Sequence, residues 1–100
     1  MDMHQKIRED ARLIMLKALA GQPNETLNSS LLRQSISAYG GIEQTREWVH
    51  GELDWLSEMG AVTLREAGTI KIATLTEKGH RHLRREIAIE GVTRPSRPGA

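Results

Sequence analysis

The order of its hydrophobic patterns is the feature that most constrains what this chain can fold into. Apolar residues recur at helical spacing through residues 3–20, again through residues 28–38, and a third time through residues 45–59. Thr45 has a hydroxyl that can accept a hydrogen bond from a free backbone N–H in a first helical turn, and Gly60 is a natural stop for the third segment. The pattern therefore predicts three helices in succession before any strand.

A different period begins after Gly60. Residues 61–65 and 69–74 alternate between apolar and polar side chains, which is the pattern of strands with one buried face. Gly68 lies between them and suits the left-handed backbone of a tight turn. These residues predict a β-hairpin.

The C-terminal part is predicted to contain one more helix and a tail. Thr76 can cap a fourth helix, in which Leu83 and Ile87 continue the inward apolar side. Residues 90–100 contain two prolines and show no hydrophobic period. We therefore expect one folded domain over residues 1–89 and a flexible tail over residues 90–100.

Three helices followed by a hairpin resemble a winged helix-turn-helix domain. One motif runs from Leu53 to Val62, where the third helix breaks at a glycine and passes into a strand. The other is Leu75-Thr76-x-x-Gly79, where the hairpin passes into the last helix. The resemblance implies a mainly α protein with a small β-hairpin, in a single winged helix-turn-helix domain.

A closer resemblance extends over nearly the whole chain. It is to a family of small proteins encoded in Mu-like phages and prophages, and it is carried by Arg8-Glu9-Asp10-Ala11-Arg12-Leu13, Trp55-Leu56-x-x-Met59-Gly60-Ala61-Val62, Ala73-Thr74-Leu75-Thr76 and Glu90-Gly91-Val92-x-Arg94-Pro95-Ser96. This resemblance implies a phage origin and the winged-helix fold. It implies no activity and supplies no site residues.

Composition narrows the class of protein further. The 100 residues are 38% hydrophobic and 27% charged, which is ordinary for a globular domain. The absence of Cys excludes disulfides, thiolate metal sites and cysteine nucleophiles. Residues 1–6 lack the apolar core of a signal peptide, and no apolar run is long enough for a membrane helix. We therefore expect a cytoplasmic protein of the host cell that does not contact a membrane.

The distribution of charge bears on binding to nucleic acid. Residues 43–60 carry one basic and five acidic residues, whereas residues 76–86 carry four basic and two acidic residues. In DNA-binding winged helices the third helix enters the major groove, so acidic residues there oppose contact with a polyanion. The C-terminal helix and tail are an alternative source of phosphate contacts. The candidates for contact with double-stranded DNA are Arg46, His50, Arg65, Lys71, Arg81, Arg84 and Arg85.

Protein interaction is the alternative function. Trp48 and Trp55 lie one heptad apart, and Trp is frequent at binding hot spots. Leu13 and Leu16 give the first helix a second apolar side, which indicates either a homodimer or burial within the chain. The candidate interface residues are therefore Leu13, Leu16, Trp48 and Trp55, and the candidate partners are a second copy or another phage protein.

Enzymatic activity is not indicated. His80 and His82 are two positions apart on a predicted helix, so they point to different sides and are expected at the surface rather than on one metal ion. Gly40-Gly41 is not followed by the Lys of a phosphate-binding loop. We therefore expect no catalytic residues, no metal and no cofactor, and a DNA-binding or regulatory accessory role with an adaptor role as the alternative.

Overall fold

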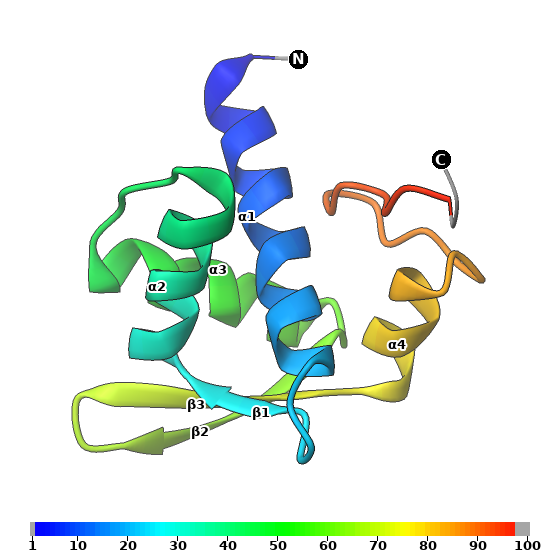
Figure 1. Ribbon diagram of the computed structural model, residues 1–100. Helices are drawn as coiled ribbons and strands as arrows, with labels where there is room; N and C mark the ends of the chain where they lie inside the picture. The colour runs from blue at the N-terminus through cyan, green and yellow to red at the C-terminus, as the bar shows by residue number, and fades with distance from the viewer. Residues whose placement is uncertain (1, 98–100) are drawn as a thin grey trace.

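Figure 1 shows the chain in a computed structural model that describes residues 2–97. Within these residues the chain forms four helices and three strands. They follow one another as α1 (Met3–Ala20), β1 (Thr26–Asn28), α2 (Ser29–Gly40), α3 (Arg46–Glu58), β2 (Val62–Ala67), β3 (Ile70–Leu75) and α4 (Glu77–Leu83). The predicted order of three helices, a hairpin and a fourth helix is confirmed, and the fold is a winged helix-turn-helix.

Each helix begins where a polar side chain accepts a hydrogen bond from the backbone N–H three residues later. The capping residues are Asp2, Asn28, Thr45 and Thr76. The caps predicted at Thr45 and Thr76 are confirmed, and Asn28 caps α2. Because one such cap contributes about 1 kcal/mol, these residues determine where each helix starts.

The sheet is antiparallel throughout, with strand order β1-β3-β2. Pairing of β2 with β3 runs to Ala67 opposite Ile70, and Gly68 begins the connecting turn with a left-handed φ of 63°. The outer strand β1 is not predicted by the sequence patterns, because its three residues are too few to show a period. It is held beside β3 by backbone pairing and by a 2.8 Å contact between the hydroxyls of Thr26 and Thr74.

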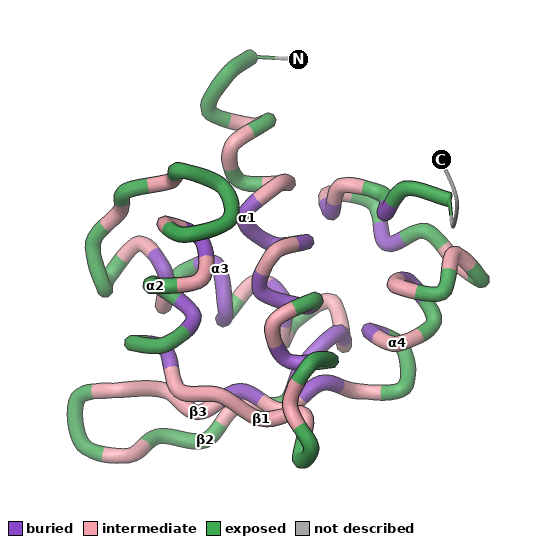
Figure 2. The backbone as a smooth tube through the Cα atoms, in the orientation of Figure 1, coloured by how far each residue is buried: buried purple, intermediate pink, exposed green. Residues whose placement is uncertain are grey.

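The core lies between the sheet and the three helices α1, α2 and α3, which cover one face of it (Figures 1 and 2). Helix α1 is enclosed on two sides, since it packs against α2 and α3 and also against α4. Its buried side chains include both Leu13 and Leu16. Of the two alternatives predicted for this side of α1, burial within the chain is the one found, since Leu16 is completely buried and Leu13 is 8% exposed.

The C-terminal part differs from its prediction. Helix α4 ends at Leu83 and does not continue to Ile87, because Arg85 adopts a left-handed φ of 63° that breaks the helix. The following residues have no regular secondary structure, yet Ile89, Val92 and Pro95 are buried. The expectation of a flexible tail is thus wrong for residues 90–97, and residues 98–100 lie outside the described residues.

Hydrogen bonds to α1 and α4 fix this C-terminal segment. His82 is completely buried and accepts a bond from the Ile89 backbone N–H at Nδ1, while its Nε2 lies 3.0 Å from the carbonyl oxygen of Thr93. Arg12 of α1 donates to the carbonyl oxygen of Gly91 at 2.7 Å. The expectation that His82 lies at the surface is therefore wrong, because the segment after α4 folds back over it.

Candidate nucleic-acid interface

A groove lies between the first turns of α2 and α3 and the start of β3. Its lining residues are Ser29, Ser30, Arg33, Thr45, Arg46, Glu47 and Ile70. The first backbone N–H groups of a helix have no partner inside the helix and carry partial positive charge. Two helix N-termini therefore lie at one groove, and two arginines add full charges to it.

Ser29 joins the three elements that form this groove. It is buried, and its Oγ lies 2.9 Å from Nε2 of His50 on α3. The same oxygen accepts a hydrogen bond from the backbone N–H of Lys71 on β3 at 3.1 Å. The start of α2, the middle of α3 and the hairpin are thereby held in one orientation. No sequence pattern indicates this role of Ser29, because it depends on the packing of α2 against α3 and β3.

His50 is half-buried by these contacts. Burial, followed by the positive charges of Lys71 and Arg46, lowers the pKa of its imidazole. Near neutral pH the ring is therefore uncharged and bonded to Ser29. The structure assigns His50 a positioning role, and its direct contact with DNA stays a prediction.

The hairpin presents two cations with different surroundings. Lys71 Nζ lies 3.1 Å from a carboxylate oxygen of Asp54 and 3.1 Å from one of Glu66. Its hydrogen bonds to these two carboxylates raise the pKa of Lys71. Arg65 is exposed, and no carboxylate among residues 2–97 forms an ion pair with it. Of the two, Arg65 has the charge that an anion can reach without competition.

The groove itself contains Arg33 and Arg46. Arg33 Nε donates to the carbonyl oxygen of Gln44 at 2.6 Å, so its guanidinium lies beside the loop that leads into α3. Arg46 Nη2 lies 3.6 Å from Glu47, in a pair whose members are both exposed. Exposed pairs of this kind are weak, so a phosphate can replace Glu47 as the partner of Arg46. Arg33 was not predicted, because its proximity to α3 arises only from the packing of α2.

The outer face of α3 is less acidic than its sequence suggests. Glu52 is only 6% exposed and points inward, where Arg12 Nε lies 2.7 Å from its carboxylate. Asp54 is paired with Lys71 on the hairpin. The expectation that all the acidic residues of this region oppose DNA is therefore wrong for Glu52, which faces the core.

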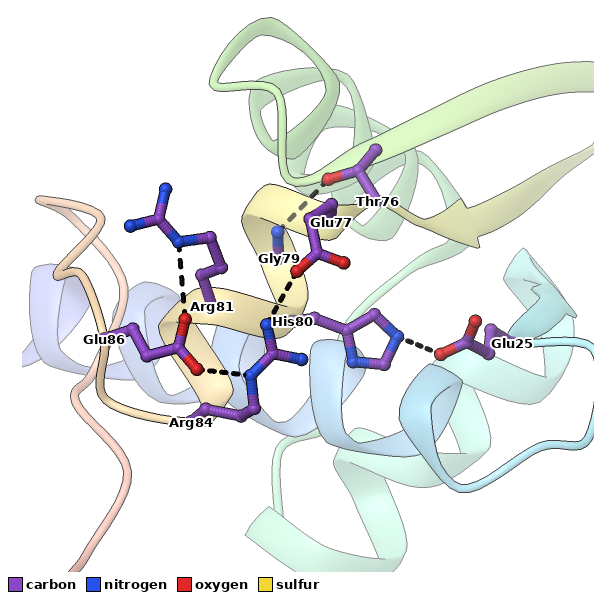
Figure 3. Close-up of polar contacts among 8 residues, drawn as sticks. All are labelled: Glu25, Thr76, Glu77, Gly79, His80, Arg81, Arg84 and Glu86. Carbon is purple, nitrogen blue, oxygen red and sulfur yellow. Dashed lines mark hydrogen bonds and ion pairs between the residues drawn. The ribbon is translucent and has the colours of Figure 1, made fainter.

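The arginines of α4 are occupied by neighbouring carboxylates, as Figure 3 shows. Arg84 lies 2.6 Å from Glu77 and 2.6 Å from Glu86, and Arg81 lies 3.5 Å from Glu86. The hydrogen bonds to Glu86 and Glu77 raise the pKa of Arg84, and the bond from Arg84 lowers the pKa of Glu86. A phosphate would have to compete with these carboxylates at Arg81 and Arg84.

Arg85 points away from this network. Its Nη1 donates to the carbonyl oxygen of Pro95 in the C-terminal segment, and no carboxylate among the described residues is paired with it. Of the three arginines predicted here as DNA contacts, Arg81 and Arg84 are therefore paired with carboxylates, and Arg85 is turned toward the C-terminal segment.

The two tryptophans do not form one open stripe. Both are half-buried and pack against the core. The guanidinium of Arg12 lies 3.8 Å from the ring centroid of Trp55, and Gly91 is so close that an added Cβ would lie 2.7 Å from that ring. Trp55 is thus covered from within the chain, whereas a partner contact at Trp48 stays a prediction.

No group of three or more His, Cys, Asp or Glu residues within residues 2–97 is placed to hold a metal ion. No helix in the same part of the chain combines the length and the apolarity that crossing a membrane requires.

Comparison with known sequences finds a phage relative. The chain is 36% identical over 94 residues to the uncharacterised protein gp26 of Escherichia phage Mu, which covers 94% of this chain and 95% of gp26. No family model matches the sequence. The resemblance to proteins of Mu-like phages is confirmed.

Comparison with solved structures finds proteins of similar fold, one of which is described as a winged-helix protein. RosR of H. salinarum superposes with a TM-score of 0.66 at 18% identity, over 76% of this chain and 67% of RosR. F93 from STIV, described as a winged-helix DNA-binding protein, gives 0.58 at 26% identity, over 74% of this chain and 79% of F93. Sco3205, a MarR family transcriptional regulator from Streptomyces coelicolor solved with DNA, gives 0.60 at 25% identity, over 82% of this chain and 52% of Sco3205.

Proposed function

The chain belongs to the phage Mu gp26 family, and we propose that it is a DNA-binding accessory factor in the regulation of transcription. Double-stranded DNA is the proposed ligand, and the cytoplasm of the host cell is the proposed place of action. The observation that carries this proposal is the groove at which two helix N-termini meet, with Arg33 and Arg46 in its lining and the exposed Arg65 on the hairpin nearby in the same domain.

The geometry suits contact with the phosphate backbone. Partial positive charge from helix N-termini favours anions, and arginine can hold a phosphate through two parallel hydrogen bonds. Arg46 is the first residue of α3, so its side chain lies where a helix entering the major groove meets the backbone. Arg65 on the hairpin extends the contact away from the groove. Winged-helix neighbours described as DNA-binding or solved with DNA support this assignment.

The same geometry predicts that contacts to phosphates, rather than contacts to bases from the outer face of α3, supply most of the affinity for DNA. Glu47 and Glu58 remain exposed on α3, and a carboxylate near DNA weakens the electrostatic part of binding. His50 is held by Ser29 and contributes no charge near neutral pH. Affinity should therefore come from the ends of α2 and α3 and from the hairpin, and it should depend strongly on salt.

The test is a titration of labelled duplex DNA at several salt concentrations. The variant Arg33→Gln/Arg65→Gln removes two phosphate contacts, so the slope of log affinity against log salt should fall by about two and the affinity by about tenfold or more. Arg8→Gln/Lys78→Gln is a matched control, because it removes the same number of charges at exposed residues that line neither the groove nor the α1–α2 surface. Binding of the double variant with wild-type affinity and slope would reject the proposal.

The α1–α2 surface supports a second candidate function, self-association. Three adjoining hollows there share Tyr39, which is 83% exposed, and two of them share Ile14. The charged lining residues are Lys17 and the ion pair of Lys6 with Asp10. Two copies can therefore bring this apolar surface together with little like-charge repulsion, which favours a homodimer over a strongly charged partner.

Of the two residues predicted for a dimer interface on α1, Leu13 lines this surface and Leu16 is completely buried. Sedimentation at high micromolar concentration should give twice the monomer mass for the wild type and the monomer mass for Tyr39→Glu. Tyr39→Phe keeps the apolar ring and is the matched control. If the wild type sediments as a monomer, this dimer interface is rejected. The α1–α2 surface would then be tested for binding to another phage protein.

A further inference from the structure

Three arginines gather at the C-terminal segment. The Arg85 guanidinium donates to the carbonyl oxygen of Pro95, and Pro95 stands in the chain between the exposed residues Arg94 and Arg97. Burial, and then the positive charges of Arg94 and Arg97, lowers the pKa of Arg85, as expected for like charges brought together. We call Arg85, Arg94 and Arg97 the C-terminal arginine cluster.

The backbone that carries this cluster is held in place. Arg85 itself has a left-handed backbone, an uncommon conformation for a residue with a side chain, which turns the chain after α4. Thr93 donates its backbone N–H to the Glu9 carbonyl oxygen at 3.2 Å and its hydroxyl to Asp10 Oδ1 at 2.5 Å. The arginines are therefore presented by a segment that is fastened to α1 rather than by a free end.

The cluster differs from the neighbouring Arg81 and Arg84 in having no carboxylate partner. Arg81 and Arg84 are paired with Glu77 and Glu86 on or near the same helix. No carboxylate among residues 2–97 lies within ion-pair distance of Arg85, Arg94 or Arg97. Mutual repulsion among three guanidinium groups near one another is relieved when an anion binds between them. Phosphate is an anion whose geometry their planar donors match through two hydrogen bonds.

We propose that the C-terminal arginine cluster is a second binding site for the phosphate backbone of DNA, separate from the groove at α2 and α3. The ligand class rests on the proposed DNA-binding function, whereas the site itself does not share residues with that groove. Recognition at the cluster is independent of sequence, because guanidinium groups that contact phosphates do not read bases.

The position of the cluster determines which DNA it can hold. Figure 1 shows the C-terminal segment and the β2–β3 turn at opposite ends of the molecule, with α1 between them. We expect a straight duplex that contacts the N-terminus of α3 and the hairpin to stay on their side of α1. The cluster therefore holds a second segment of DNA, and one protein molecule can bridge two segments.

The test is a bridging experiment in the Tyr39→Glu background, which prevents self-association from linking two duplexes. One duplex is immobilised, and retention of a second, labelled duplex is measured. Arg94→Glu/Arg97→Glu should abolish retention of the second duplex while leaving binding to the first within about twofold. Lys17→Glu/Lys78→Glu changes the net charge by the same amount at exposed residues outside the cluster, and it should retain bridging.

The outcomes separate the two proposals. Loss of all binding in Arg33→Gln/Arg65→Gln, together with unchanged bridging in Arg94→Glu/Arg97→Glu, would support the groove and overturn the cluster. The opposite outcome is that Arg33→Gln/Arg65→Gln still binds DNA in a salt-dependent way, and that binding is lost only when Arg94→Glu/Arg97→Glu is added. That outcome would support the cluster and reject the groove. Binding to vesicles of phosphatidylserine is measured as well. If the protein binds these vesicles through the cluster and does not bind DNA, the assignment of the cluster to nucleic acid is overturned.

Discussion

The buried arginine of α1 and the arginines at the C-terminal end show how one side chain is used in two ways. Arg12 is 5% exposed and is enclosed by the Glu52 carboxylate, the Gly91 carbonyl oxygen and the Trp55 ring. Arg94 and Arg97 are exposed and have no carboxylate partner among the described residues. An arginine whose donors are satisfied inside the protein holds the fold together, whereas one without a partner is available to a ligand.

Removing the buried Arg12 should lower the stability of the protein more than any other substitution proposed here. Arg12→Ala leaves Glu52 buried beside Arg8 alone, whose Nε lies 3.7 Å away and whose side chain is half exposed. Breaking a buried pair on one side costs about 3–5 kcal/mol, so we expect the free energy of unfolding to fall by about 3 kcal/mol. Urea denaturation measures this change.

The matched control removes both charges together. Arg12→Met/Glu52→Leu leaves no unpaired charge in the core and should recover most of the lost stability. If the double variant is as unstable as Arg12→Ala, the hydrogen bond to Gly91 rather than the ion pair is the main contribution of Arg12.

The second prediction concerns Gly91, where the C-terminal segment passes Trp55. Its φ is +96°, and an added Cβ would lie 2.7 Å from the Trp55 ring and 3.3 Å from Arg12 Nη1. Gly91→Ala combines backbone strain with overpacking and should lower the free energy of unfolding by about 2–3 kcal/mol.

Gly51→Ala is the control for a glycine with space around it. Gly51 lies within α3, and nothing lies within 4 Å of an added Cβ. Alanine there should stabilise the protein by about 0.5–1 kcal/mol, since it favours the helix over the unfolded chain. Equal effects of the two substitutions would show that the Gly91 contact does not fix the C-terminal segment.

The sequence predicted those parts of the fold whose signals are local. Thr45 and Thr76 were identified as caps because a hydroxyl before a helical pattern has one common use, and Gly68 because a tight turn needs a left-handed residue. Strand β1 has no local signal, since its pairing with β3 joins residues such as Thr26 and Thr74 that lie far apart in the chain. The prolines after residue 90 correctly indicated that this segment is not helical. They did not indicate that it packs against the rest of the domain.

The candidate site was predicted in part for the same reason. Arg46 and Arg65 follow from the outward positions of α3 and the hairpin, and the structure leaves both exposed. The spacing of Glu52 within α3 does not indicate that it is buried. Its burial depends on the ion pair with Arg12, which lies forty residues earlier in the chain. Arg33 and Ser29 join the groove through helix packing, which no spacing within α2 indicates.

The smallest expected effect is a pH dependence at the contact between Thr93 and Asp10, on the border between the two regions compared. Burial alone would raise the pKa of Asp10, but the hydrogen bond from Thr93 and the interactions with Lys6 outweigh it and lower the pKa below its ordinary value. The ionised carboxylate is thus favoured in the folded protein. This contribution to stability is present above the unfolded pKa of about 4 and is lost as the pH falls through the folded value.

Thr93→Val removes the donor while keeping the shape of the side chain. The variant should be less stable than the wild type by about 1 kcal/mol at pH 7, because the bond is to a charged but half-exposed carboxylate. The difference should shrink as the pH is lowered below 4, since both proteins then carry a protonated Asp10. Thermal unfolding at a series of pH values measures it, with Thr93→Ser as the control that retains the hydroxyl. A difference between Thr93→Val and the wild type that stays constant down to pH 2 would mean that Thr93 acts through packing, and that the C-terminal arginine cluster is held without this charge-assisted bond.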